Sequence, residues 1–510
     1  MRKWQYPRFI IGVILANGVS VGSAWAAYSS DFAGGTFSLT GYIREYLAIN
    51  LENKSDILAN GDKAGGQWDL NMARSVLLLD GGADYGRVRV KAIGRWSREV
   101  ETNYLDRLND SSSADIMDDY NENSLRELYA DIDITDRVAL RLGKQQVAWG
   151  ETDSFQVLDL VNGFDLNWRS SFEAENEELR KPLYMANLTV EVPSLAGSLQ
   201  LLYRPGWDDK ADPVHTLPFE GGRFAVQGSR GSNVLDIIPL NYHHSRGDTK
   251  DASYGARWSG IAKQIGYTLN YYHTVSTAPV INFANFGFPG FRSFGDAPKN
   301  GFAEFIFPEI DVIGGSFNAY SAALDTVFRG ELAYIPDKPY NHGFSGTPLG
   351  GALNIIEKDT AIWMLGIDKK FPGTVNLLGT SEPAVLTGQI IDTWVVNFDK
   401  DDDLLESGVT PRREHSVVTT WILGLNFRHS KVNPTVGLIY DATYGGGLGL
   451  LGLTNVIGDN WRIYTEYLGF FKNGQTCSIN PATGSGIGCQ HGFGNFDNAD
   501  QITVRLTYQF

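Results

Sequence analysis

Cysteine is nearly absent from this chain of 510 residues, which contains only Cys477 and Cys489. A metal site at this place would need two more soft ligands, and only His491 lies nearby. Both cysteines stand in one polar, glycine-rich segment. In an exported chain a disulfide that closes a short loop is therefore the better interpretation.

Catalytic signatures are also missing. The sequence has no Gly-x-Ser-x-Gly elbow, no His-Glu-x-x-His helix and no phosphate-binding loop, and its eight histidines are scattered. We therefore predict that the chain is not an enzyme and has no catalytic, cofactor-binding or metal-binding residues. The net charge of −16 argues against nucleic acid as a partner, because nucleic acid attracts basic surfaces.

Long apolar runs are absent after the N-terminus, so the sequence offers no transmembrane helix, which needs about 20 such residues. Hydrophobic residues nevertheless make up 43% of the chain, while the mean hydropathy is −0.20. Apolar residues must therefore be dispersed among polar ones. Together with 57 glycines, 23 tyrosines and 27 phenylalanines, this indicates a sheet with one apolar face and one wet face.

Residues 1–26 have the order of a secretory signal peptide. Three basic residues precede an apolar stretch at 9–21, and Ala24-Trp25-Ala26 supplies small residues for cleavage. The alternative is an uncleaved anchor helix, but the stretch is short and is broken at Asn17 and Gly18. We predict cleavage, with residues 27–510 forming a single domain.

Strict alternation of apolar and polar residues recurs along the chain and is clearest in its last segment. One face there carries Ile502, Val504, Leu506, Tyr508 and Phe510. Elsewhere the polar face is often charged. Burying these charges in a packed core would be unfavourable, whereas a water-filled lumen keeps them hydrated. The alternation therefore favours a membrane barrel over a soluble sandwich.

The pattern predicts about 18 strands, an even number as expected for bacterial barrels, with 16 as the alternative count. The expected strands are 37–50, 69–80, 86–98, 124–134, 137–146, 182–193, 197–204, 252–262, 264–274, 317–328, 329–336, 358–370, 385–397, 415–428, 431–443, 448–457, 460–471 and 499–510. Mostly long loops follow the odd strands and mostly short turns follow the even ones. The predicted fold is all-β, a transmembrane antiparallel up-and-down β-barrel with long external loops.

A terminal aromatic with a tyrosine two residues before it, here Phe510 and Tyr508, resembles the signal that outer-membrane barrels present to their assembly machinery. This resemblance makes the barrel assembly machinery an expected partner.

Charged side chains should line part of the lumen. The candidates are Arg87, Arg89, Lys91, Arg95, Glu127, Asp131, Asp133, Arg137 and Arg141. They are expected to meet as cross-strand pairs in a closed sheet. Two interpretations stay open: a salt-bridge network that stiffens the wall, or a basic ladder that guides an anionic solute. The first is favoured, because the acidic residues would offset most of the field.

Residues 143–153 read Gly-Lys-Gln-Gln-Val-Ala-Trp-Gly-Glu-Thr-Asp, and residues 158–166 read Leu-Asp-Leu-Val-Asn-Gly-Phe-Asp-Leu. These stretches resemble the signature of a proteobacterial outer-membrane family known as domain of unknown function 1302. That family usually has proline where this chain has Gly163. The resemblance implies a barrel over the whole mature chain and a role in moving hydrophobic compounds across the outer membrane, and it assigns no catalytic residues.

The segment 147–181 is too long and too apolar for a simple surface loop. We expect it to fold into the barrel and bury its apolar residues. Its candidate pore-facing residues are Glu151, Asp153, Asp159, Asp165 and Arg169. The alternative is that the segment caps the outer mouth.

Phenylalanines crowd the loop at 275–316, which should face outside: Phe283, Phe286, Phe288, Phe291, Phe294, Phe302, Phe305 and Phe307. Exposed aromatics on that scale are unfavourable. Packing is the favoured interpretation, with a path for an apolar solute as the alternative.

Together these features predict an integral outer-membrane channel or uptake protein for hydrophobic or amphipathic small molecules. Its expected partners are outer-membrane lipid and lipopolysaccharide, the solute itself and a periplasmic transport partner. The alternative is a non-transporting barrel with a structural, adhesive or docking role.

Overall fold

The computed structural model describes residues 28–32, 34–52, 66–153, 155–169, 176–208, 213–225, 229–285, 293–342, 354–406, 410–472, 492–497 and 499–510. The predicted signal peptide (1–26), the pair Cys477 and Cys489, and the phenylalanines at 286, 288 and 291 lie outside these described residues.

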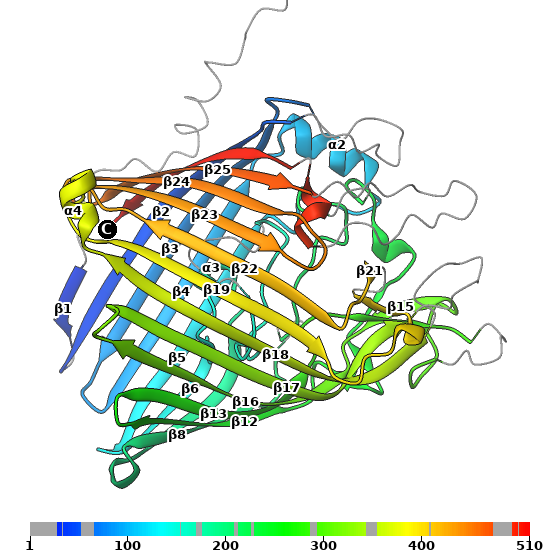
Figure 1. The fold of residues 1–510 in the computed structure, drawn as a ribbon, viewed down its shortest axis with the longest axis horizontal. Coiled ribbons are helices and arrows are strands. Elements are labelled where there is room, and N and C mark those ends of the chain that lie inside the picture. The colour runs from blue at the N-terminus through cyan, green and yellow to red at the C-terminus, as the bar shows by residue number, and fades with distance from the viewer. Residues whose placement is uncertain are drawn as a thin grey trace, which may run out of the picture.

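A closed wall of 18 antiparallel strands forms the molecule (Figure 1). Its strands are β2 (Gly35–Asn50), β3 (Leu70–Asp84), β4 (Val88–Glu99), β5 (Glu122–Thr135), β6 (Val138–Gln145), β7 (Leu183–Val192), β8 (Gly197–Arg204), β12 (Ser253–Ala262), β13 (Ile265–Val275), β16 (Glu309–Ser321), β17 (Thr326–His342), β18 (Asn354–Phe371), β19 (Ala384–Val395), β22 (His415–Gly424), β23 (Val432–Asp441), β24 (Gly447–Ile457), β25 (Trp461–Phe471) and β26 (Gln501–Gln509). Each strand pairs with the next, and β26 pairs with β2 to close the ring. The predicted barrel and its strand number are confirmed.

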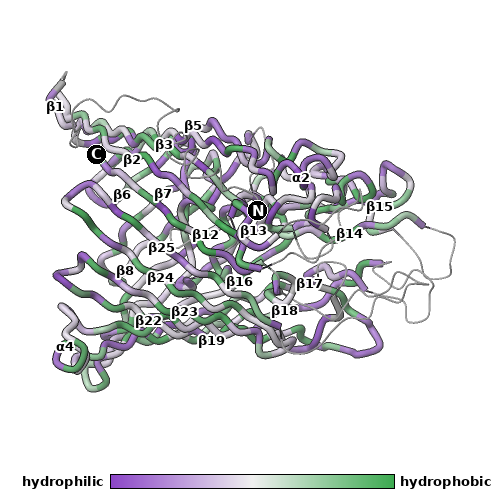
Figure 2. Tube along the Cα trace, turned by 90° about the horizontal axis from the view of Figure 1, so that it is seen from above, coloured by the Kyte–Doolittle hydropathy of each residue, from purple (hydrophilic) through white to green (hydrophobic). Residues whose placement is uncertain are grey.

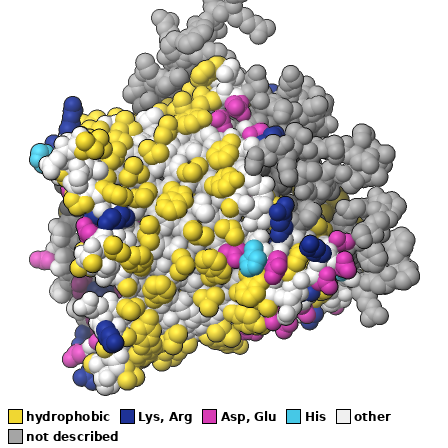
Figure 3. Space-filling view, viewed as in Figure 1, with side chains coloured by type: hydrophobic (Ala, Val, Ile, Leu, Met, Phe, Trp, Pro, Cys, Tyr) yellow, Lys and Arg dark blue, Asp and Glu magenta, His cyan; other side chains and the backbone are white. Residues whose placement is uncertain are grey.

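Hydrophilic and hydrophobic residues alternate along the strands (Figure 2), so the wall has two unlike faces. On the outer face apolar side chains dominate (Figure 3), among them Leu438 and Leu451, which are 42% and 54% exposed. The intervening positions face inward and are often polar, such as Arg44 and Thr507, which hydrogen-bond to each other at 3.0 Å. This arrangement is that of a transmembrane barrel. None of the described helices is long and apolar enough to span a membrane.

Long connections gather at one end of the barrel, called here the long-loop end, and short turns at the other, the short-turn end. The long connections carry α2 (Asn103–Ser111), η2 (Val234–Asp236), η3 (Lys400–Asp402), η4 (Gly492–Phe496) and the small strands β9 (Leu240–Asn241), β10 (His243–His244), β11 (Gly247–Asp248), β14 (Val280–Phe283), β15 (Ala303–Ile306), β20 (Leu404–Glu406) and β21 (Thr410–Pro411). The short-turn end carries η1 (Pro193–Leu195), α4 (Gly373–Leu378) and β1 (Tyr28–Phe32), which pairs with the start of β2.

The strands predicted at 317–328 and 329–336 are misplaced, because β16 begins at Glu309 and β17 extends to His342. The expected break between Phe328 and Arg329 lies inside β17, and the turn is at residues 322–325 instead. This turn carries no glycine, proline or asparagine, and three of its four residues are apolar. Its tight bend relies on Asp325 at a positive φ of 46°, for which the sequence gives little warning.

Phenylalanines of the loop at 275–316 pack against a neighbouring loop and against each other. Phe305 stacks on Phe219 with ring centroids 4.6 Å apart, and Phe283 meets Phe302 edge to face at 5.9 Å. Packing therefore buries Phe305 and partly buries Phe219 and Phe283 at the long-loop end, while Phe302 stays 39% exposed.

Candidate functional site

The inserted segment, residues 147–181, connects β6 to β7 and crosses the interior of the barrel. Val157, Leu158 and Leu160 pack against inward-facing residues of β16, β17, β18 and β19, such as Ile335. Further along, Trp168 meets Tyr46 of β2, with ring centroids 5.8 Å apart. Strands β2 and β17 lie on opposite sides of the ring in the strand order. The segment therefore reaches from one wall to the other.

Hydrogen bonds inside the segment hold its two ends together. Asn162 accepts a hydrogen bond from the backbone N–H of Val147 at 3.0 Å and donates one to the carbonyl of Lys181 at 2.8 Å. Trp149 is 1% exposed and donates its indole N–H to Gln200 of β8. The stretches that resemble the family signature thus supply both the buried rings and the amide that fixes the base of the segment.

Three arginines of the wall bind the C-terminal part of the segment, residues 176–180, which contains α3 (Asn176–Leu179). Arg44 of β2 forms an ion pair with Glu178 at 2.5 Å. Arg95 of β4 donates to the carbonyl of Glu178, and Arg126 of β5 donates to the carbonyl of Arg180, both at 2.8 Å. Arg95, predicted as part of a lumen ladder, therefore anchors the segment.

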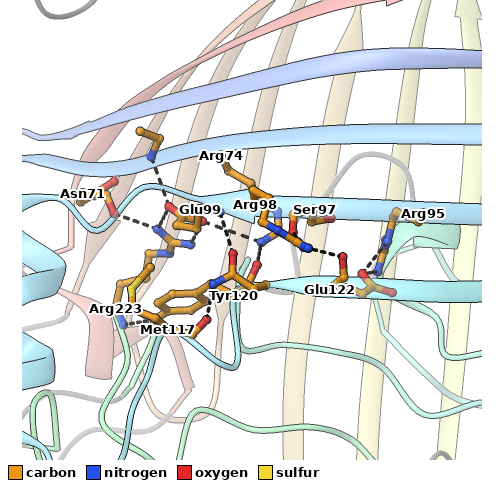
Figure 4. Close-up of polar contacts among 12 residues, drawn as sticks. Asn71, Arg74, Arg95, Ser97, Arg98, Glu99, Met117, Tyr120, Glu122 and Arg223 are labelled. Atoms are coloured by element: carbon orange, nitrogen blue, oxygen red, sulfur yellow. Dashed lines mark hydrogen bonds and ion pairs between the residues drawn. The ribbon is translucent and has the colours of Figure 1, made fainter. Parts of the chain in front are cut away.

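A second network ties the wall to the loops at the long-loop end (Figure 4). Arg223 binds both carboxylate oxygens of Glu99 at 2.8 Å, and its backbone N–H donates to the Tyr120 hydroxyl at 2.9 Å. Arg74 contacts the carbonyl of Tyr120 and lies 3.8 Å from Glu99. The loops that carry Tyr120 and Arg223 are therefore held against β3 and β4 by hydrogen bonds and ion pairs.

The predicted pore-facing residues divide into two groups. Asp153 keeps 39% of its side chain exposed and forms a two-oxygen ion pair with Arg329 at 2.9 and 3.0 Å. Glu151 is also partly exposed and accepts a hydrogen bond from Asn318 at 3.2 Å. These two residues remain candidates for contact with a solute.

Of the other three, Asp159 and Arg169 do not face water as expected. Asp159 forms a buried ion pair with Arg180, and Arg169 forms one with Glu466 of β25 at 2.6 Å. Asp165 is partly exposed and accepts the backbone N–H of Asn167 at 3.2 Å, and desolvation raises the pKa of its carboxyl. Asp159 thus pairs within the segment and Arg169 pairs with the wall, because an unpaired buried charge is costly.

Most of the predicted wall charges are paired across strands. The pairs are Arg89–Asp133 at 2.7 Å, Arg141–Asp131 at 2.7 Å, Lys91–Asp80 at 2.5 Å and Arg95–Glu122 at 2.5 Å, and Glu127 accepts a hydrogen bond from Gln146 at 2.8 Å. Arg87 and Arg137 lie at exposed turn positions of the short-turn end, where Arg87 pairs with Asp136, so these two do not line the lumen. Because acidic residues balance most of these cations, this part of the wall does not present a row of unpaired positive charges.

Several residues that hold the segment were not singled out from the sequence: Arg44, Arg126, Glu178, Arg180, Arg329 and Glu466. Arg44, Arg126, Arg329 and Glu466 stand on the polar face of an alternating strand, which was the available signal. Within the described ranges, no group of three or more His, Cys, Asp or Glu is placed to hold a metal ion.

Comparison with solved structures finds barrels that are similar to this chain at low sequence identity. OmpF of Salmonella typhi, solved with daunomycin, has a TM-score of 0.41 and 8% identity, covering 95% of this chain and 100% of that one. OccAB3 of Acinetobacter baumannii has a TM-score of 0.45 and 9% identity over 93% and 99%. OpdK of Pseudomonas aeruginosa, solved with vanillate, has 0.44 and 10% over 93% and 98%.

The comparison with curated proteins found no match. A family model described as "Protein of unknown function (DUF1302)" matches residues 9–510. Because that match covers nearly all 510 residues, the chain belongs to the DUF1302 family.

Proposed function

We propose that this protein is an outer-membrane channel for small hydrophobic or amphipathic molecules, narrowed by the inserted segment. The observation that carries the proposal is the path of that segment, which contacts opposite walls of the barrel through Leu158 and Trp168. A barrel of about 18 strands is otherwise wide enough to hold an aqueous channel. The segment therefore sets the limiting diameter.

The segment is built to stay in place. Asn162 joins its first and last residues. Arg44 binds its C-terminal part through Glu178, and Arg169 joins it to β25. A loop that only covered the mouth would not need buried ion pairs on the inner wall, since each such pair carries a desolvation cost. A fixed constriction explains them.

Asp153, Arg329 and Asp368 form the partly exposed charged group next to the segment, with Arg329 Nε 3.0 Å from Asp368. Because two carboxylates share one guanidinium, this group carries a net negative charge. It should favour cations over anions among small ions and leave neutral solutes unaffected.

The apolar outer face supports a location in the outer membrane, where the barrel would contact lipid and lipopolysaccharide. At the short-turn end, Trp461 and Tyr508 lie with ring centroids 4.8 Å apart, as expected for an aromatic girdle at the membrane boundary. We expect this end to face the periplasm, after export through a signal peptide and insertion by the barrel assembly machinery.

Single-channel recording of the purified protein in planar lipid bilayers tests the proposal. The wild-type protein should give discrete current steps in KCl, and a neutral aromatic glycoside added on one side should interrupt them. A protein that inserts but passes no current would instead support the alternative, a non-transporting barrel that serves as a docking partner for a periplasmic machine.

A further inference from the structure

The inner wall divides into a charged part and an uncharged part. Strands β2, β3, β4, β5 and β6 carry inward-facing arginines such as Arg44, Arg95 and Arg141. Four consecutive strands on the other side, β19, β22, β23 and β24, carry only one charged residue at their inward-facing positions, Asp441. Its carboxylate lies at the long-loop end and accepts the backbone N–H groups of Thr443 and Tyr444.

Apolar side chains on this uncharged part remain partly exposed although they face inward. Val418, Ile422 and Leu450 are each intermediate in exposure. Inward-facing apolar residues under the inserted segment are covered, as Val312 shows at 3% exposure. Phe155 of the segment, Val418 and Leu450 each pack against a buried cluster that contains Ile439 and Leu448. The surface is therefore covered near the long-loop end and partly exposed from Val418 and Leu450 toward the short-turn end.

One of two inward-facing glycines leaves room along the same strands. A Cβ atom added at Gly424 would meet nothing within 4 Å. Gly437 sits in register between Ile422 and Leu450, and a Cβ there would lie 3.3 Å from the Leu450 Cβ. The side chains of Ile422 and Leu450 therefore close over Gly437, while the wall is open at Gly424, toward the short-turn end.

We infer that these inward faces of β22, β23 and β24 form the solute track, and that its solute is an uncharged molecule with an apolar body and hydroxyl or carbonyl groups. This inference rests on the proposed channel function. An apolar body can lie on Ile422 and Leu450, while Thr435, inward-facing beside Gly424, offers a hydroxyl. A charged solute would lose hydration there without gaining a partner, which is unfavourable.

Two probes that share one aromatic body separate the solute classes. Proteoliposomes filled with β-glucosidase report entry of neutral p-nitrophenyl glucoside, and proteoliposomes filled with phosphatase report entry of anionic p-nitrophenyl phosphate. The wild-type protein should admit the neutral probe faster. Gly424→Trp should slow the neutral probe by about tenfold, equivalent to a barrier raised by about 1.4 kcal/mol.

Ala139→Trp is the matched control, because Ala139 also faces inward near the short-turn end but lies in the charged part, opposite Asp133. It should leave entry of the neutral probe within about twofold, or roughly 0.4 kcal/mol, of wild type. Ile422→Asp tests the track without added bulk and should slow the neutral probe while KCl conductance persists, whereas Ile422→Val should behave as wild type.

Each outcome decides between the proposals. If the wild-type protein admits neither probe and passes no current, the channel function fails and this inference fails with it. If wild type admits the probes but Gly424→Trp and Ile422→Asp do not slow the neutral one, the channel stands and the track is elsewhere. Equal slowing by Gly424→Trp and Ala139→Trp, or faster entry of the anionic probe into wild type, would also overturn the inference.

Discussion

The ion pair between Arg169 and Glu466 should decide whether the inserted segment stays docked. The Arg169 Nη2 lies 2.6 Å from the Glu466 Oε1, and the two side chains are 2% and 1% exposed. In Arg169→Met, Glu466 would keep the hydrogen bond from Tyr464 at 2.8 Å but lose this cation. Removing one partner of a buried ion pair costs about 3–5 kcal/mol.

That cost falls on the docked state, because an undocked segment would leave Glu466 open to water in the lumen. Each 1.4 kcal/mol is tenfold in an equilibrium constant, so undocking should become roughly a hundredfold to a few thousandfold more frequent. In single-channel recordings we expect the steady wild-type level to be replaced by repeated steps to a higher conductance.

The double variant Arg169→Met/Glu466→Met is the control, since an apolar pair of similar volume removes the uncompensated charge. It should return the current to a steady level. A correctly inserted Arg169→Met protein with the same steady conductance as wild type would refute the view that this pair holds the segment.

Four further predictions concern separate parts of the chain. Asp153→Lys should shift the reversal potential in a KCl gradient toward anion selectivity, and an unchanged potential would place Asp153 off the ion path. Deleting Phe510 should leave the protein uninserted, which loss of heat-modifiable mobility on gels would reveal; normal insertion would count against the assembly signal. Peptide mass spectrometry without reduction should find Cys477 and Cys489 linked, whereas two free thiols would exclude the bond. Burial lowers the pKa of His215 to about 3, and its Nδ1 accepts a backbone N–H of the inserted segment at 2.9 Å. Because that pKa is depressed, the contact is fully stable above about pH 6.5 and weakens by about 1.4 kcal/mol per pH unit as pH falls toward 3. Hydrogen exchange of the segment should rise in acid for wild type but not for His215→Gln, and equal exchange in both would contradict this role.

The wall could be predicted from sequence because lipid and lumen impose opposite demands on successive residues. In β26, Val504 and Leu506 face outward while Thr503 and Thr507 face inward, and the same period recurs around the ring. The turn at residues 322–325 could not be found in this way, since alternation says nothing about where a strand bends when no turn-forming residue marks the place.

Apolar residues such as Val157 and Leu158 were enough to predict that the inserted segment is buried. Its ion-pair partners were not predictable, because they come from distant parts of the chain; Arg169 and Glu466 are 297 residues apart. Asp159 differs, because its partner Arg180 lies in the same segment, only 21 residues away. Its burial depends on how the segment folds back on itself, which the apolar residues do not specify.

The most direct test of the central claim is the single-channel conductance of a protein whose residues 152–167 are replaced by a short Gly-Ser linker. If the inserted segment sets the limiting diameter, conductance should rise at least about threefold, because an unfilled barrel of this size leaves a wide lumen. Discrimination between neutral and anionic solutes should weaken in the same recordings. A well-inserted variant with unchanged conductance and unchanged discrimination would show that the segment does not form the constriction.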